Sequence, residues 1–217
     1  MPSTERAAPP LDRTAEVVRY DIANTGREAL AKLSNRFYWD LVNATTADRA
    51  AEAGGALLQL MRDADALLCT SSGLSPGGWI DQARAWGGTA KGGNSAAWYE
   101  FAARSQPTVW TPQKEGSTTL TGLHDYANKQ WGGWVGGFYR RRTKCYVDQA
   151  VADLAAKREV NATEYIACVA QWSYNWTHDS LEAGPQYKLC AHDGQPTGDV
   201  VTVSERLLNK YGALLGL

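Results

Sequence analysis

Each of the three histidines in this chain is followed directly by an aspartate, at His124, His178 and His192. Such a pair could supply a general base and a carboxylate that orients it. Adjacent side chains diverge by about 100° on a helix, however, and no nucleophile accompanies any of the pairs. We therefore interpret all three as surface histidines and assign no catalytic role to them.

Carboxylates are the next candidates, because hydrolysis of a glycosidic bond needs two carboxyl groups that face one sugar across a cleft. Asp81, Glu100 and Asp125 are available. Each falls at a helical position where an exposed or ion-paired carboxylate is the commoner outcome. The nucleotide loops GxGxxG and GxxxxGK[ST] do not occur. The sequence thus predicts no catalytic residue and no cofactor.

The cysteines offer no metal site. Cys69, Cys145, Cys168 and Cys190 contain no CxxC spacing, and the one close histidine neighbour is His192. This is not the signature of a zinc site. An even number of cysteines permits two disulfides in an oxidising compartment, although a chain of this size does not need them. Buried free thiols are an equally good interpretation, and both stay open.

Aromatic residues are the compositional anomaly, with nine tryptophans and ten tyrosines against three phenylalanines. Sugar recognition favours rings that combine an apolar face with a polar edge. Core packing explains most of these rings, and Trp39, Trp79, Trp134 and Tyr139 fall on apolar stripes. Trp110 differs, because it follows Pro107 at a predicted helix break and at the mouth of a loop. We predict a ligand contact for Trp110.

Charge and hydropathy exclude several classes of protein. The formal net charge is −1 and the pI is about 6.3, which argues against a nucleic-acid partner. The basic run Arg140, Arg141, Arg142 and Lys144 is interpreted as a solvated or ion-paired helix face. No membrane span or signal peptide is expected in this chain. Sequons at Asn43, Asn161 and Asn175 hint at a secretory history. These features suggest a piece of a longer secreted protein.

The elements that must position these residues are helices. Apolar residues recur at helical spacing over 12–43, 48–68, 79–86, 96–104, 125–157, 163–175 and 203–214. Thr46 or Asp48 could cap the second helix, and Pro107 should end or kink the fourth. We predict an all-α fold, an irregular bundle of about six to seven helices. A disordered N-terminal segment over 1–11 should precede one helical domain over 12–217.

Several stretches resemble one known family. They are RYDIANTGREAL (19–30), GGWIDQARAWG (77–87), YEFAARSQPTVWTP (99–112) and HDYANKQWGGWVGGFYRRR (124–142). Together they are similar to the C-terminal region of α-N-acetylglucosaminidases, glycoside hydrolase family 89, and the likeness extends more loosely to GDVVTVSERLLNKY (198–211). Departures include Thr111, where the family has glycine, and a longer loop between Trp110 and Asp125.

The resemblance implies a retaining enzyme that removes terminal α-linked N-acetylglucosamine, in animals from heparan sulfate. In that family a helical domain packs against a catalytic TIM barrel, which carries both catalytic glutamates. The residues matching those that reach the sugar are Trp110, Leu123 and Tyr126. The resemblance also implies a secreted or lysosomal protein.

The leading hypothesis is an accessory domain that completes a pocket for an N-acetylglucosamine-terminated glycan. A barrel of the same enzyme family would be its partner and supply the acid and the nucleophile, so the chain alone is predicted to be inactive. The alternative is a stand-alone, non-catalytic helical module that binds sugar or protein. An enzyme of unrelated chemistry has no motif to support it.

Overall fold

The computed structural model describes residues 12, 15–89, 93–120, 122–178, 190 and 196–217. Within these residues the chain forms α-helices and no strands, as the all-α prediction required. The predicted disordered segment 1–11 lies outside the described residues, as does His192. The helices are α1 (Glu16–Val42), α2 (Ala47–Leu68), α3 (Gly77–Trp86), α4 (Ala96–Ser105), α5 (Arg140–Ala155), α6 (Ala162–His178) and α7 (Val200–Leu215).

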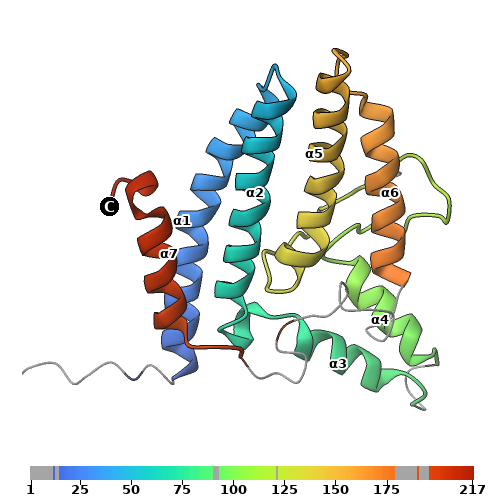
Figure 1. Cartoon of the computed structure of the whole chain (residues 1–217). Coiled ribbons are helices and arrows are strands. Elements are labelled where there is room, and N and C mark those ends of the chain that lie inside the picture. The colour runs from blue at the N-terminus through green and yellow to red at the C-terminus, as the bar shows by residue number, and fades with distance from the viewer. Residues whose placement is uncertain (1–11, 13–14, 90–92, 121, 179–189, 191–195) are drawn as a thin grey trace, which may run out of the picture.

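Helices α1, α2 and α7 pack side by side at one side of the molecule, and α5 and α6 form a pair at the other (Figure 1). Helix α2 contacts both groups, and α3 and α4 lie together across one end. The α1–α2–α7 bundle has a leucine-rich core. Thr46 caps α2 by accepting the N–H of Arg49, so the first of the two predicted caps is the one used.

A second core is aromatic. It joins α3, α4 and α6 to the segment before α5, and its buried residues are Ile80, Ala103, Val109, Trp134, Phe138 and Trp176. Trp134 was correctly predicted as core, but Trp39 and Trp79 were not, since they are 60% and 45% exposed. Trp79 lies at the rim because its indole N–H donates to the Ala103 carbonyl. The apolar stripe alone did not distinguish rim from core.

The predicted helix over 125–157 is wrong in its first part, over residues 125–139. Residues 134–139 form a π-helix, and the α-helix begins only at Arg140. Gly133 and Asp125 have positive φ angles of 81° and 52°, which an α-helix excludes. The carboxylate of Asp65 on α2 accepts the N–H groups of Gly133 and Gly136 at 2.6 and 2.7 Å. A tertiary contact therefore satisfies amides that an α-helix would have paired internally.

Two disulfides settle the question that the cysteine count left open. Cys69 pairs with Cys190 and Cys145 pairs with Cys168, and no described cysteine is free. The first bridge ties the end of α2 to the segment before α7, and the second joins α5 to α6. Gly132 packs against the first bridge, because a Cβ there would lie 2.6 Å from the Cys190 sulfur. The disulfide therefore fixes the chain just before the π-helix.

None of the described helices combines the length and the apolar character that crossing a membrane requires.

Candidate functional site

Trp110 lies in a tight turn that follows α4. Helix α4 ends at Ser105, as Pro107 predicted, and Trp110 adopts a positive φ of 54°. A bulky residue occupies this left-handed region only where its surroundings hold it there. Here the Trp110 N–H donates to the Ser105 carbonyl at 2.7 Å, and the Thr108 hydroxyl donates to the Arg104 carbonyl. The turn holds the indole at the surface, 44% exposed.

Tyr126 is presented from a second strained turn. The preceding residue, Asp125, has positive φ, and its N–H donates to the Thr108 carbonyl at 3.0 Å. Both carboxylate oxygens of Asp125 accept from Nη1 of Arg142 on α5, at 2.7 and 3.0 Å. A backbone bond and an ion pair thus fix the residue next to Tyr126.

The two turns bring the rings of Trp110 and Tyr126 together. Their centroids are 5.3 Å apart, and the planes are tilted by 58°. Tyr126 is 68% exposed, so both rings face solvent rather than the core. Separation or full burial of the two rings would have contradicted a shared binding surface, and neither occurs.

Leu123 joins the same pair of turns. Its carbonyl accepts the N–H of Thr111 at 3.2 Å, and its own N–H donates to the Thr111 hydroxyl at 3.1 Å. Thr111 is one of the departures from the family pattern, and here its hydroxyl anchors the longer loop. The Leu123 side chain is 51% exposed. All three predicted site residues therefore lie on two adjoining, hydrogen-bonded turns.

Tyr139 supports this site and was not foreseen in that role. Its hydroxyl donates to the Pro107 carbonyl at 3.2 Å, which ties the π-helix to the turn that carries Trp110. Burial raises the pKa of Tyr139, so the phenol stays neutral and remains a donor at physiological pH. The sequence analysis placed Tyr139 on an apolar stripe, and its ring does pack against the aromatic core. The stripe gave no information about the hydrogen bond that its hydroxyl makes.

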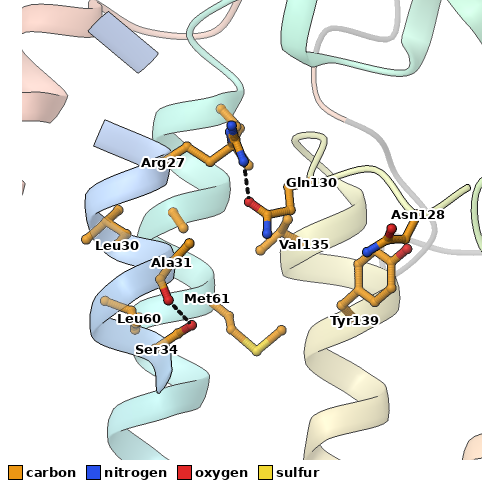
Figure 2. Close-up of a pocket in the computed structure, with 12 residues that line it drawn as sticks. Arg27, Leu30, Ala31, Ser34, Leu60, Met61, Asn128, Gln130, Val135 and Tyr139 are labelled. Carbon is orange, nitrogen blue, oxygen red and sulfur yellow. Dashed lines mark hydrogen bonds between the residues drawn. The ribbon is translucent and has the colours of Figure 1, made fainter. Parts of the chain in front are cut away.

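A small cavity of about 190 Å³ adjoins Tyr139 between α1, α2 and the π-helix. Figure 2 shows Asn128 beside the Tyr139 ring on one side of this cavity, with Leu30, Ala31 and Ser34 of α1 on the other. Gln130 accepts a hydrogen bond from Nη1 of Arg27 at 2.7 Å. Arg27 thereby anchors the segment that follows Tyr126, so the site loop is held from both ends.

The three carboxylates considered as possible catalytic acids make structural interactions instead. Glu100 is 3% exposed and is held by Arg84 of α3 and by Arg104 of α4. Asp125 is ion-paired with Arg142 as described. Asp81 lies on α3, where it has interactions of its own. Glu100 is closed off from substrate, and its ion pairs join α3 to α4 just before the Trp110 turn.

Two sequence predictions agree with the structure in part. They are the solvated or ion-paired helix face expected for the basic run and the surface position expected for the histidines. Arg142 and Lys144 are ion-paired with Asp125 and Asp148, and Arg140 donates to the Leu58 carbonyl. His178 is exposed at the end of α6, whereas Nδ1 of His124 is buried without a hydrogen-bond partner among the described residues. His124 is therefore not simply a surface histidine. No cluster of three metal-binding side chains occurs within the described part of the chain.

Comparison with known proteins identifies the family to which this chain belongs. Residues 5–210 match the family model described as the α-N-acetylglucosaminidase (NAGLU) C-terminal domain. The chain belongs to this family. The human α-N-acetylglucosaminidase is 29% identical over 202 residues, covering 91% of this chain and 25% of the human protein.

Two solved structures share the fold. One is the family 89 glycoside hydrolase from Clostridium perfringens in complex with 2-acetamido-1,2-dideoxynojirmycin, with a TM-score of 0.71, 20% identity and coverage of 91% of this chain. The other is a variant of the Clostridium perfringens enzyme in complex with its substrate GlcNAc-α-1,4-galactose, with a TM-score of 0.70, 20% identity and coverage of 89%. This chain spans 21% of the length of each bacterial protein.

Several positions of the motifs that carry the family resemblance have a visible structural role here. Arg84 and Arg104 enclose Glu100, Arg27 holds Gln130, and Asp125 pairs with Arg142. The Glu100–Arg104 pair lies just before the Trp110 turn, the Arg27–Gln130 bond reaches the segment 128–130, and the Asp125–Arg142 pair holds the residue next to Tyr126. In this α-N-acetylglucosaminidase C-terminal domain, the quoted motifs are thus connected through one set of ion pairs and hydrogen bonds.

Proposed function

We propose that this chain is the accessory helical domain of an α-N-acetylglucosaminidase-type glycoside hydrolase, and that it forms one wall of the pocket for a terminal α-linked N-acetylglucosamine. The supporting observation is the exposed Trp110–Tyr126 pair on two turns that the rest of the domain holds in place. Tryptophan and tyrosine combine an apolar ring face with a polar edge, which suits a sugar's C–H face and hydroxyls. Leu123 adds apolar contact beside them.

The catalytic groups belong, in this proposal, to a barrel domain that packs against these turns. The chain spans only 25% of the human relative and 21% of the bacterial ones, so most of each relative lies outside the matched region. Within the chain, Glu100 and Asp125 are committed to arginine partners. Glycoside hydrolysis by the family's two-carboxylate chemistry therefore requires acids from elsewhere.

A secretory or lysosomal location forms part of the proposal. Both disulfides fit an oxidising compartment. The sequon residues Asn43 and Asn161 are exposed at helix ends, where a glycan would meet no packed surface. Asn175 is half-buried on α6, so its modification is less favoured.

The direct test is a titration of the whole chain with methyl α-N-acetylglucosaminide, followed by the NMR signals of the tryptophan indole N–H groups. We expect weak binding that shifts the Trp110 signal, since only one wall of the pocket is present. Trp110→Ala and Tyr126→Ala should each weaken binding by about threefold to tenfold, the range expected for one aromatic contact.

Trp86→Ala is the matched control, because Trp86 is also an exposed tryptophan, on α3. It should leave the affinity unchanged. Equal losses from Trp86→Ala and Trp110→Ala, or no binding at all, would refute the proposed site. Hydrolysis of an aryl α-N-acetylglucosaminide by the chain alone would refute the division of roles between this domain and a barrel.

The stand-alone module remains the alternative, and sedimentation of the purified chain separates the two. A domain that lacks its barrel exposes the surface that the barrel would cover, and such apolar surface promotes association. We expect concentration-dependent association. A monomer at all concentrations would favour the stand-alone module.

A further inference from the structure

The turn between α1 and α2 carries one of the three sequons, formed by Asn43, Ala44 and Thr45. Figure 1 shows this turn at the end of the molecule opposite to α3 and α4. Asn43 and Thr45 are both exposed, and the residue between them is not proline, so the local sequence meets the requirement of an N-glycosylation acceptor. The side chain of Asn43 makes no hydrogen bond within the described part of the chain. Its amide nitrogen is therefore accessible and uncommitted.

A cavity of about 480 Å³ opens directly beside this asparagine, between the end of α1 and the first turns of α2. Asn43 itself forms part of the wall. The lining also includes an exposed indole and three charged side chains, which are Trp39, Asp40, Arg49 and Glu52. A volume of this size lies within the range of small-molecule sites, about 300 to 1,000 Å³, so the cavity has room for a sugar unit.

Trp39 gives the cavity an aromatic face. Four positions separate it from Asn43, and side chains at this spacing are neighbours on one face of a helix. The helical geometry extends to the asparagine, because the Asn43 N–H donates to the Trp39 carbonyl at 3.1 Å. Tyr38 packs against the indole edge to face, with centroids 5.3 Å apart. An exposed indole in this position can receive the C–H face of a sugar attached to Asn43.

The charged side chains of the cavity are not committed to other contacts. Asp40, Arg49 and Glu52 form no ion pair and no side-chain hydrogen bond with any residue that the structure describes. Arginine supplies donors and the two carboxylates supply acceptors. The hydroxyls and the acetamido group of N-acetylglucosamine both donate and accept hydrogen bonds. The polar rim therefore matches a neutral amino sugar that lies on the indole.

The other two sequons are placed differently. The side-chain oxygen of Asn161 accepts an N–H from the first turn of α6, and its nitrogen donates to Glu164 at 3.2 Å. Asn175 is half-buried on α6 and accepts a hydrogen bond from Gln171 at 2.8 Å. Both side chains are already used by the fold, whereas that of Asn43 is not. The structure thus favours Asn43 over the other two.

We propose that Asn43 is an N-glycosylation site and that the first N-acetylglucosamine of its glycan packs on Trp39 in this cavity. The donor is an oligosaccharide linked to a polyprenyl diphosphate. The bond from C1 of the sugar to the diphosphate oxygen breaks, a bond from C1 to Nδ2 of Asn43 forms, Nδ2 loses one proton, and the polyprenyl diphosphate leaves. Modification in nature rests on the secretory location in the proposed function, whereas the cavity and its chemistry do not.

The first test asks whether Asn43 is modified. The whole chain is secreted from eukaryotic cells behind an added leader peptide, so that it meets the glycosylation machinery whatever its native location. High-mannose glycans are then trimmed with an endoglycosidase that leaves one N-acetylglucosamine on each modified asparagine. Peptide mass spectrometry should find this sugar on Asn43. Thr45→Ala keeps the asparagine but removes the sequon, and it should abolish the modification.

The second test asks where the sugar lies. Nuclear Overhauser contacts should join protons of the Trp39 ring to those of the trimmed sugar. The sugar should also raise the melting temperature by about 2 to 4 °C, the shift that one aromatic contact produces in a chain of this size. Its contribution is the difference between wild type and Thr45→Ala as secreted, corrected by the same pair made without glycosylation in the bacterial periplasm.

Variants at two tryptophans locate the contact. In Trp39→Ala the sugar should raise the melting temperature by less than about 1 °C, because its aromatic platform is gone. Trp86→Ala is the matched control, since Trp86 is also an exposed tryptophan at a helix end and is not part of the cavity lining. The contribution of the sugar should be unchanged there. Circular dichroism spectra confirm that each variant is folded.

The outcomes separate this proposal from the proposed function. An unmodified Asn43 in the secreted chain, a sugar without contacts to the Trp39 ring, or a stabilisation that survives Trp39→Ala would each overturn it. None of these results alters the titration that tests Trp110 and Tyr126. Conversely, a chain that binds no N-acetylglucosaminide at Trp110 can still carry the glycan on Asn43, so each proposal fails by its own measurement.

Discussion

Two aspartates on α2 face two different regions and are held there in opposite ways. Asp63 faces the α1–α2–α7 bundle, where Lys210 and Tyr211 of α7 donate to its carboxylate. Asp65, about 200° further around the helix, faces the π-helix and accepts backbone N–H groups from Gly133 and Gly136. Burial opposes ionisation of both, yet hydrogen bonds keep the pKa of Asp63 below its ordinary value, whereas burial raises the pKa of Asp65 to about 6.

The difference reflects how each region is built. The bundle is regular, with a leucine-rich core. The site region combines an aromatic core, a π-helix and two turns with left-handed residues, and buried polar groups hold these irregular pieces in place. Regular helices satisfy their own backbone, but irregular backbone must find partners elsewhere in the fold. The region that carries the candidate site therefore depends on individual polar contacts more than the bundle does.

The test with the largest expected effect on stability compares two glutamates, one in each region. Glu100→Gln leaves Arg104, which is fully buried, without its carboxylate, and the loss of one partner of a buried ion pair costs about 3 to 5 kcal/mol. Glu28→Gln breaks an exposed pair with Arg27 in the bundle and should cost less than about 1 kcal/mol. Urea denaturation at pH 7 measures both free energies of unfolding. Similar losses for the two variants would end the distinction between the regions.

The two aspartates provide the next test, through pH. The folded-state pKa of Asp65 lies above its ordinary value of 3.8, so its contribution to stability falls as pH rises from about 4 to about 6. At about 1.4 kcal/mol per pKa unit, the change amounts to about 3 kcal/mol. Measured against wild type, Asp65→Asn should therefore gain about 3 kcal/mol in relative stability between pH 4 and pH 7, as followed by urea denaturation across that range.

Asp63→Asn is the matched control with the opposite sign. Its folded-state pKa is lowered, so the stability it contributes is present above its ordinary pKa and is lost on acidification. Asp63→Asn should be destabilising at pH 7, and the difference from wild type should shrink below about pH 4. Parallel pH profiles for the two variants would contradict the environments described for α2.

The test with the smallest expected effect on stability uses two helical glycines. A Cβ on Gly136 in the π-helix would lie 2.5 Å from the Asp65 carboxylate, so Gly136→Ala should cost about 1 to 3 kcal/mol through overpacking. Gly55 on α2 is exposed and has open space around it, so Gly55→Ala should stabilise by about 1 kcal/mol. Melting temperatures should move in opposite directions. A Gly136→Ala variant as stable as wild type would mean that the π-helix tolerates closer packing than its geometry indicates.

The bundle was predicted well because its helices follow one rule. In α1 and α2, leucines recur at the spacing of a helix with one buried face, and the observed bounds differ from the predicted ones by a few residues at most. The predicted helix over 125–157 failed for a matching reason. Its apolar spacing was helical, but the geometry of residues 125–139 is set by contacts with Asp65 and Arg142 and by the positive φ of Gly133. None of these features produces a periodic pattern in the sequence.

Trp110, Leu123 and Tyr126 were named from the sequence as candidate site residues and lie together in the structure, and their binding role stays a prediction, whereas the residues that support them were not foreseen. Trp110 could be singled out because a proline breaks the helix just before it. Arg142 and Tyr139 could not, since their contacts with Asp125 and Pro107 join positions 17 and 32 residues apart. A single sequence gives no signal for such pairings. An ion pair was one of the outcomes expected for Glu100, but its arginine partners and its burial were not foreseen, for the same reason.

By itself, the sequence determined the helical class, the leucine-rich bundle and, through its motifs, the family. The tertiary structure decided where α5 begins, which cysteines pair and which aromatic rings face solvent. Local spacing records which side of an element is apolar, because that pattern repeats every few residues. Left-handed turns, a π-helix and ion pairs between distant residues arise only when separate elements meet, so they become visible only in the folded chain.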